Sequence, residues 1–228
     1  MRLLVHIKQN ARSYSVNTPE IEIVDCDQGS DKWFSVRRGI PTASNFSDVM
    51  ASGRDGGISK TRDLLLRKLA GEIVSGVNRE DFRNSAMDRG NTMEDDVRSL
   101  YAMISGVEPV KVGFVRRAMR YGIIGASPDS FVGDERGVEI KTSAPHLLIE
   151  ILKADRVPPE HVLQIQGCMM VTGRKTWDLA IGYTGMPLFR KTIRRDESVI
   201  ARLDLALSVF YEELNELVAW LRAYGKNP

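Results

Sequence analysis

Residues 127–143 read SPDSFVGDERGVEIKTS, and the order of residue types in this stretch decides the fold. The letters GDERG at 133–137 form a turn sequence between two short apolar runs. We therefore expect a β-hairpin in which residues 123–132 pair with residues 137–142.

The charged side chains of this hairpin are expected to meet on one face. Side chains alternate along a strand, so Glu139 and Lys141 share a face, roughly 6–7 Å apart, while Ile140 points the opposite way into a core. Asp129 lies on the neighbouring strand of the hairpin. Two carboxylates and one amine would then converge.

Helical and strand patterns extend outward on both sides of this hairpin. Helices are indicated by capping residues, periodic apolar positions and glycine or proline stops, and strands by short apolar or alternating runs. The expected helices are one from the start signal at 28–31 to the stop at Gly39, and others at 42–51, 59–74, 82–104, 158–170 and 197–224. The expected strands are 110–115, 122–126, 138–142, 176–183 and 188–193.

This order of elements predicts one three-layer α/β domain over residues 1–228, with a central mixed β-sheet flanked by helices. Residues 1–24 are a candidate extended N-terminal arm, within which residues 21–24 either form a short strand or continue the arm. The chain has 228 residues and is 43% hydrophobic, which is enough to bury a substantial core.

Composition also bears on location and redox chemistry. No run approaches the ~20 apolar residues that cross a bilayer, and the start MRLLVHIKQNARS lacks the apolar core of a signal peptide. We therefore expect a soluble protein of the cytoplasm. Cys26 and Cys168 are the only cysteines, too few for a disulfide framework or an iron–sulfur cluster, and both are expected to be buried thiols.

The formal net charge of +2 gives no overall sign of nucleic-acid binding. Local basic clusters either line a groove that follows phosphates or form ordinary solvated surface. These clusters are Arg37 with Arg38, Arg116 with Arg117 and Arg120, and Arg190 with Lys191, Arg194 and Arg195.

Asp129, Glu139 and Lys141 suit metal-assisted cleavage of a phosphodiester. Mg²⁺ prefers oxygen ligands and keeps several waters, so two or three carboxylates and a carbonyl form a sufficient protein site. Lys141 beside the ion would lose some ammonium character, and it could activate or orient the attacking water while balancing phosphate charge. A Glu-x-Lys triplet by itself is more often structural, so its surroundings decide the interpretation.

Those surroundings resemble the PD-(D/E)-x-K nuclease superfamily. Pro128 and Asp129 are followed by a spacer and then by the acid-x-Lys pattern of Glu139 and Lys141. A second set of residues resembles lambda exonuclease and the related viral recombinase (alkaline) exonucleases, from about residue 25 to 175. This set comprises Gln28 with Gly29, Trp33, Arg37, Gly39, Thr42 with Ala43 and Ser44, Gly90 with Glu94, Ser127 with Pro128 and Asp129, 137–141, and Gln164 with Ile165 and Gln166.

The resemblance implies a restriction-endonuclease-like fold and a set of site residues. The implied metal ligands are Asp129, Glu139, the backbone carbonyl of Ile140, and Glu94 directly or through water. Lys141 would serve the nucleophilic water. The implied pocket for a 5′-terminal phosphate consists of Arg37, Ser44, Ser127 and Gln164, with Arg37 as the anchor because its planar fork can hold two phosphate oxygens.

Several of these residues have a purely structural alternative. Arg37 could be a surface helix cation, Ser44 a residue of a polar helix turn, and Glu94 part of a solvated acidic run. Gln164 could be a core amide bonded to backbone. Outside the implied site, Trp33 is expected to be core packing, Met87 a candidate wedge between terminal bases, and His161 has no assigned role.

The resemblance implies a Mg²⁺-dependent 5′→3′ exonuclease that degrades linear double-stranded DNA from 5′-phosphorylated ends to 5′-mononucleotides, with Mn²⁺ as the alternative ion. It would leave 3′ single strands for recombination by strand annealing. Family members form ring-shaped homotrimers and act beside a single-strand annealing protein, so a phage or prophage protein in a bacterial cytoplasm is expected. The alternatives are an endonuclease or another repair nuclease of the superfamily, an iron–sulfur exonuclease, which the two cysteines oppose, and a catalytically degenerate DNA-binding module.

Overall fold

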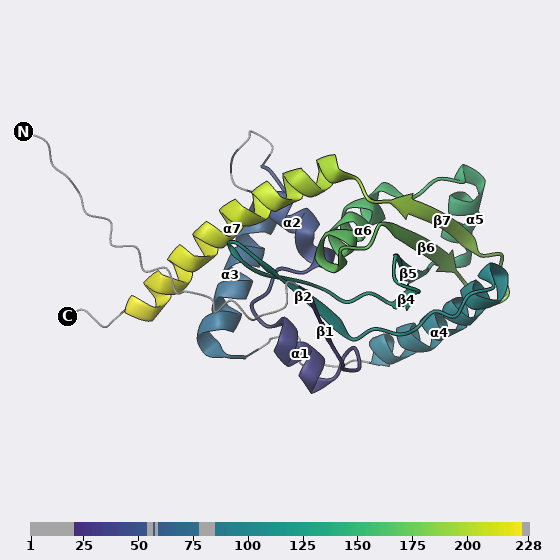
Figure 1. Ribbon diagram of the computed structural model, residues 1–228, viewed down its shortest axis with the longest axis horizontal. Helices are drawn as coiled ribbons and strands as arrows, with labels where there is room; N and C mark the ends of the chain where they lie inside the picture. Colours follow the sequence, from purple (N-terminus) through teal and green to yellow (C-terminus); the bar gives the residue numbers. More distant parts are fainter. Residues whose placement is uncertain (1–20, 54–56, 58, 78–84, 225–228) are drawn as a thin grey trace, which may run out of the picture.

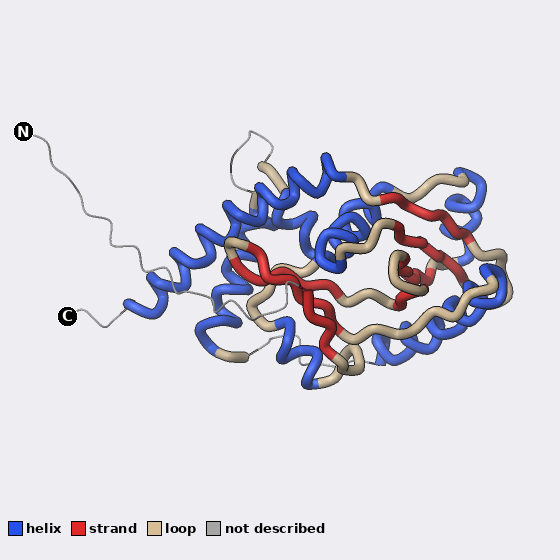
Figure 2. The backbone as a smooth tube through the Cα atoms, viewed as in Figure 1, coloured by secondary structure: helices blue, strands red, loops and turns tan. Residues whose placement is uncertain are grey.

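The computed structural model describes residues 21–53, 57, 59–77 and 85–224, with the backbone alone described for 85–92. Figure 1 shows the arrangement of the elements, and Figure 2 shows strands at the centre with helices around them. The helices are α1 (Asp31–Arg37), the 3₁₀ helix η1 (Ala43–Asn45), α2 (Phe46–Met50), α3 (Lys60–Ser75), α4 (Ser85–Ser105), α5 (Pro145–Ala154), α6 (Pro159–Thr172) and α7 (Glu197–Ala223). The strands are β1 (Ile21–Val24), β2 (Phe114–Met119), β3 (Gly122–Ala126), β4 (Ser130–Val132), β5 (Arg136–Thr142), β6 (Thr176–Gly182) and β7 (Phe189–Arg194).

A four-stranded mixed sheet in the order β4-β5-β6-β7 forms the centre of the fold. β4 and β5 are antiparallel, β5 and β6 are parallel, and β6 and β7 are antiparallel. A parallel pair needs a long crossover connection, which α5 and α6 supply here. This mixed α/β fold with helices on both sides confirms the expected restriction-endonuclease-like class.

The two faces of this sheet are covered by different helices. On one face, Val138 and Ile140 of β5 pack against Val97 and Tyr101 of α4. On the other, alternate residues of β6 such as Leu179 join the larger core shared with α6, α3 and α7. The period-two alternation of the strands produces this division, because neighbouring residues point to opposite faces.

The hairpin expected for 123–132 and 137–142 is only partly correct. Ser130–Val132 pairs with β5, but Gly122–Ala126 pairs with β2 in a separate antiparallel sheet of order β1-β2-β3. Pro128 lies between the two strands; proline has no N–H to donate and restricts the residue before it, which ends a strand. The chain therefore passes from one sheet to the other just before Asp129.

The structure also decides the remaining elements that the sequence left open or placed differently. β1 is a strand, so the first alternative for residues 21–24 is the correct one. The strand expected at 110–115 begins only at Phe114, because Val110 makes a single isolated bridge to Phe131. Ile104, an apolar residue in the last turn of α4, is 53% exposed. The sequence patterns did not predict α5, whose Pro145 start follows the end of β5 closely.

Several helix ends follow from local capping. The Ser30 side chain accepts from Trp33 N at the start of α1, and Asp196 accepts from two backbone N–H groups at the start of α7. Gly76 and Gly173 end α3 and α6 in the left-handed conformation that glycine adopts without strain. Among the described helices, none is long and apolar enough to cross a membrane.

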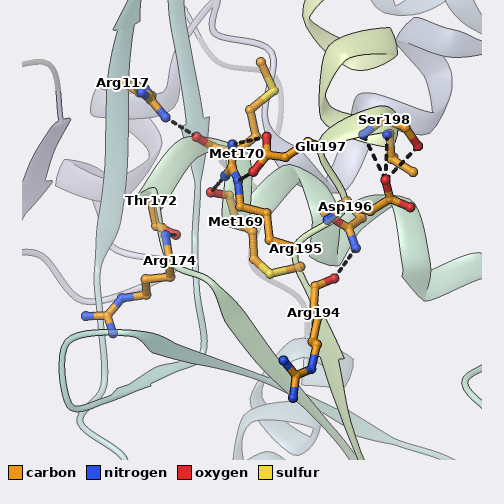
Figure 3. Close-up of polar contacts among 12 residues, drawn as sticks. Arg117, Met169, Met170, Thr172, Arg174, Arg194, Arg195, Asp196, Glu197 and Ser198 are labelled. Atoms are coloured by element: carbon orange, nitrogen blue, oxygen red, sulfur yellow. Dashed lines mark hydrogen bonds and ion pairs between the residues drawn. The ribbon is translucent and has the colours of Figure 1, made fainter.

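The carboxyl end of α6 is held by two arginines from other elements. Figure 3 shows Arg117 of β2 directed at the Met170 carbonyl and Arg195 at the Met169 carbonyl. Cations at a helix carboxyl end satisfy its unpaired carbonyls and oppose its dipole. This fastening matters for function because α6 also carries Gln164.

Candidate active site

Glu139 and Lys141 meet on the face of β5 opposite Ile140, as the alternation predicts. Lys141 Nζ lies 2.7 Å from Glu139 Oε1, although Glu139 is only 2% exposed. Gln164 of α6 donates from Nε2 to the same oxygen at 2.6 Å. Gln164 is therefore bonded to a buried carboxylate, and the alternative of a core amide bonded to backbone is wrong.

Asp129 lies at the end of the chain's passage into β4 and reaches across to β5. Its Oδ2 accepts from Ile140 N at 2.6 Å, which places the carboxylate beside Glu139 as expected. Burial and the neighbouring Glu139 charge raise the pKa of the Asp129 carboxyl well above its usual value. A second support comes from Ser130, whose hydroxyl donates to the Asp129 carbonyl and accepts from Arg98 Nε.

Glu94 joins the same electrostatic cluster from α4. Burial raises the pKa of its carboxyl, against the opposing effects of the Lys141 and Arg98 charges. Its neighbour Asp95 is instead exposed and paired with Lys111. The acidic run is therefore split, and Glu94 is the member that turns toward the site rather than toward solvent.

Lys141 is a cation in this setting. Burial alone would lower its pKa, but the charges of Glu139 and Asp129 outweigh burial, so the pKa is raised. The loss of ammonium character expected beside a bound ion stays a prediction. A charged ammonium can still orient a water molecule by donating hydrogen bonds and can balance phosphate charge.

The donor set fits a hard divalent cation. Glu139 Oε2 is buried and accepts no hydrogen bond within the described part of the chain, and an orphaned buried carboxylate oxygen is costly unless something binds it. Among the described residues, no group of three or more acidic, histidine or cysteine side chains is placed to hold a metal by itself. The neighbouring carboxylates of Asp129 and Glu139 offer the oxygen ligands that Mg²⁺ prefers.

The four residues expected to hold a terminal phosphate line one cavity together with the acidic cluster. The cavity has a volume of about 200 Å³. Its wall includes Arg37, Ser44, Ser127 and Gln164, and also Asp129, Glu139, Lys141, Gln28, Trp33, Thr42, Ala43 and Cys168. The structure therefore brings all of the predicted side chains except Glu94 to one cavity, and Glu94 lines the adjoining one with Asp129.

Trp33 is a pocket residue, and the expectation that it is core packing is wrong. Its ring lies 4.0 Å from the Arg37 guanidinium carbon, and its Nε1 donates to Ser127 Oγ at 2.9 Å. Phe34, the next residue, is the one that α1 buries in the core. A tryptophan offers both an apolar face for a cation and a polar N–H, which explains this double contact.

Gln28 is a second residue whose place in the site the sequence patterns did not predict. Its side-chain amide donates to the carbonyls of Val112 and Pro128, each at 2.9 Å, and so fixes the peptide that precedes Asp129. It lines both cavities, the second of which has a volume of about 270 Å³. The sequence offered one indication of this role, because Gln28 belongs to the residues that resemble the exonuclease family. The local sequence pattern predicts only a helix start at this position.

The remaining expectations concern the basic clusters, the two cysteines, His161 and Met87. Of the basic clusters, Arg37 alone lines the cavity that holds the acidic cluster, while the other two clusters contain cations committed to helix ends and ion pairs, such as Arg117 and Lys191. Cys168 is a buried thiol as expected, whereas Cys26 is only half-buried. His161 lies on α6, where burial first and the Lys141 charge second lower its pKa. The Met87 side chain lies outside the described residues.

Comparison with known proteins identifies the family of the chain. The family model of the YqaJ-like viral recombinase domain matches residues 32–175, which include every site residue predicted from the sequence, whereas Gln28 lies just before the matched range. A search among curated proteins found no match.

The solved structures that resemble this chain include exonucleases. LHK-Exo, an alkaline exonuclease from Laribacter hongkongensis, is 29% identical over 86% of this chain and 98% of its own, with a TM-score of 0.76. The structure of LHK-Exo in complex with dAMP is 30% identical over the same shares, 86% and 98%, with a TM-score of 0.77. A phage-related exonuclease from Haemophilus somnus, 16% identical over 80% of this chain and 96% of its own with a TM-score of 0.60, shares the fold.

Proposed function

Because the chain belongs to the YqaJ-like viral recombinase family of lambda-exonuclease-like DNA exonucleases, we propose that it degrades linear double-stranded DNA in the 5′→3′ direction from 5′-phosphorylated ends. The products would be 5′-mononucleotides and a 3′ single strand. The dAMP complex of LHK-Exo supports a mononucleotide product, because dAMP is such a molecule.

One observation carries this proposal: side chains that can donate hydrogen bonds to a phosphate line the same cavity as the acid-x-Lys cluster. Arg37, Ser44 and Ser127 line the same wall as Asp129 and Glu139. Arginine and hydroxyl groups suit an anionic terminal phosphate. A strand end anchored there would place its first phosphodiester beside the carboxylates, so that one nucleotide is released in each cycle.

Each side chain has a separate task in this mechanism. Arg37 binds the terminal phosphate with its fork, stacked on Trp33, while the Trp33 N–H holds Ser127 so that its hydroxyl can donate its own proton. Lys141 orients the attacking water and opposes the charge that develops on the phosphate. Gln164 keeps Glu139 in place through their 2.6 Å hydrogen bond.

The family's nucleases are metal-dependent, and we propose Mg²⁺, with Mn²⁺ as the alternative, at the site formed by Asp129, Glu139 and the Ile140 carbonyl, with Glu94 beside it. When bound, such an ion lowers the pKa of water and stabilises negative charge on a phosphate. The orphaned Glu139 Oε2 supports this placement.

The wider biology follows as part of the same proposal. The chain would act as one nuclease domain, assemble as a homotrimeric ring around DNA, and supply 3′ strands to a single-strand annealing protein for recombination. A phage or prophage protein working in the bacterial cytoplasm suits that role, and the viral recombinase family supports it.

The test uses a linear duplex with a 5′-phosphate on one strand and a 5′-hydroxyl on the other, incubated with Mg²⁺, Mn²⁺ or EDTA. We expect metal-dependent loss of the phosphorylated strand from its 5′ end, and Lys141→Ala should abolish it. Lys175→Ala is the matched control, because Lys175 is exposed and paired only with Glu135 among the residues described.

Two results would contradict the proposal in different ways. Cleavage of a covalently closed circular duplex would indicate an endonuclease. Binding to DNA without any metal-dependent cleavage would indicate a degenerate binding module.

A further inference from the structure

The terminal-phosphate pocket is built from two sides of one short turn. Arg37 ends α1, and Ser44 lies in η1; residues 38–42 connect the two helices, and both side chains line the same cavity. The conformation of this turn therefore fixes the distance between the arginine and the hydroxyl. Whatever fastens the turn also sets the shape of the phosphate pocket.

A buried carboxylate from another helix fastens the middle of this turn. Glu72 of α3 is 6% exposed, and its Oε2 accepts from Gly39 N at 2.8 Å. Glu72 continues the inward face that Leu65 and Leu69 begin, a position where an apolar residue would be expected. Burying a carboxylate is unfavourable unless it is bonded, so this residue is explained by the bond that it makes.

The turn also packs directly against α3 at the same point. Gly39 has a φ of 67°, and a Cβ atom there would lie 2.4 Å from Ile73 Cγ1. No side chain fits between the turn and the helix, so the turn is in direct contact with α3 and a shift of α3 would move the turn. The far end of the turn is held by Gly125 N, which donates to Pro41 O at 3.0 Å.

We propose that Glu72 is a positioning residue for the terminal-phosphate pocket, acting through the Gly39 N–H to place Arg37. It touches no part of the substrate. This inference rests on the proposed function, because it assigns Glu72 to the preference for a 5′-phosphate. Without the carboxylate, Gly39 N–H loses its acceptor and the turn relaxes. The Arg37 guanidinium then moves away from the position in which it would bind the terminal phosphate.

The test compares kcat/KM on 5′-phosphorylated and 5′-hydroxyl duplex ends. Glu72→Ala should lower the ratio between the two ends about 10- to 100-fold, since a shift of about 1 Å in a positioning group has effects of that size. The loss should fall on the phosphorylated end alone. Glu72→Gln keeps an acceptor for Gly39 N–H, so it should restore most of the ratio.

A double-substitution cycle with Arg37→Ala separates positioning from general destabilisation. If Glu72 acts through Arg37, the doubly substituted protein should show the same ratio as Arg37→Ala alone. Glu216→Ala, an exposed glutamate on α7, is the matched control and should leave the ratio unchanged. If Glu72→Ala does not fold, Glu72→Asp replaces it, because one fewer methylene withdraws the acceptor while keeping the charge.

Three outcomes would overturn the inference. Equal loss at both ends would show that Glu72 only stabilises the fold, and an unchanged ratio would show that the turn does not depend on it. An additive double substitution would show that Glu72 and Arg37 act independently. A wild-type protein with no phosphate preference would overturn the end recognition in the proposed function itself, which distinguishes that failure from this one.

Discussion

Asp129→Asn should make the metal-free protein more stable while it removes the catalysis. In the folded protein, burial and the Glu139 charge disfavour the ionised Asp129 carboxyl and raise its pKa. Asparagine has nearly the same shape, and its side-chain oxygen can still accept from Ile140 N, which now donates to Asp129 at 2.6 Å. The substitution thus removes a disfavoured charge and keeps the hydrogen bond.

The expected magnitude is the difference between two effects. Removing the disfavoured charge is stabilising, whereas the bond from Ile140 N weakens by about 1 kcal/mol when its acceptor becomes neutral. A net gain of about 1–2 kcal/mol is typical when one substitution relieves a destabilised active site. For a chain of this length, that gain corresponds to an increase of about 2–8 °C in Tm.

The order of stability should reverse when a divalent cation is added. An ion at a concentration 100 times its Kd stabilises the wild-type protein by about 2.7 kcal/mol, and the Asp129→Asn variant lacks one of the proposed ligands. Thermal unfolding followed by circular dichroism in EDTA and in excess Mg²⁺ measures both effects. Asp134→Asn, in the exposed β4–β5 turn, is the matched control and should change neither Tm.

The pH dependence gives a second check on the same reasoning. A carboxyl whose pKa is raised by folding binds its proton more tightly in the folded state, so its unfavourable effect on stability appears as the pH rises above the unfolded value of about 4. The advantage of Asp129→Asn in EDTA should therefore shrink toward pH 4 and grow toward neutral pH. An Asp129→Asn variant less stable than the wild type in EDTA at neutral pH would refute the reasoning.

The remaining predictions concern the side chains of Trp33 and Tyr101. Trp33→Phe keeps a ring beneath Arg37 but removes the N–H group that donates to Ser127. The value of kcat/KM on 5′-phosphorylated ends should therefore fall about 5- to 30-fold, which corresponds to a loss of about 1–2 kcal/mol. An unchanged value would show that Ser127 does not need this hydrogen bond. Burial and a hydrogen bond to Asp178 at 2.7 Å raise the pKa of Tyr101 to about 12. Because the phenol's unfolded pKa is about 10, its stabilising effect is complete below pH 10 and is lost between pH 10 and 12. Urea unfolding should show Tyr101→Phe less stable than the wild type by about 1–3 kcal/mol at pH 8, with a smaller gap at pH 11, and a constant gap would contradict this account.

The helix boundaries and the acid-x-Lys geometry could be predicted because they depend on neighbouring residues. Ser30, Gly76 and Gly173 cap their helices through contacts within a few positions along the chain. Glu139 and Lys141 share a face because a strand alternates, and no distant partner is needed for that. The reading of Trp33 failed for the opposite reason: an aromatic residue on a short helix suits the core or a pocket equally well until Ser127 is brought beside it.

The sequence by itself therefore determined the chemistry of the site: two carboxylates and a lysine with the spacing that a strand converts into a cluster. Only the tertiary structure decided which residues surround that cluster. The division of residues 123–132 between two sheets, and the burial of Glu72 beneath Gly39, depend on partners that are far away along the chain. Local patterns specify which face of an element is apolar, but the partner that covers that face is chosen by packing of the whole chain, and that choice placed Arg37, Ser44 and Ser127 beside the carboxylates.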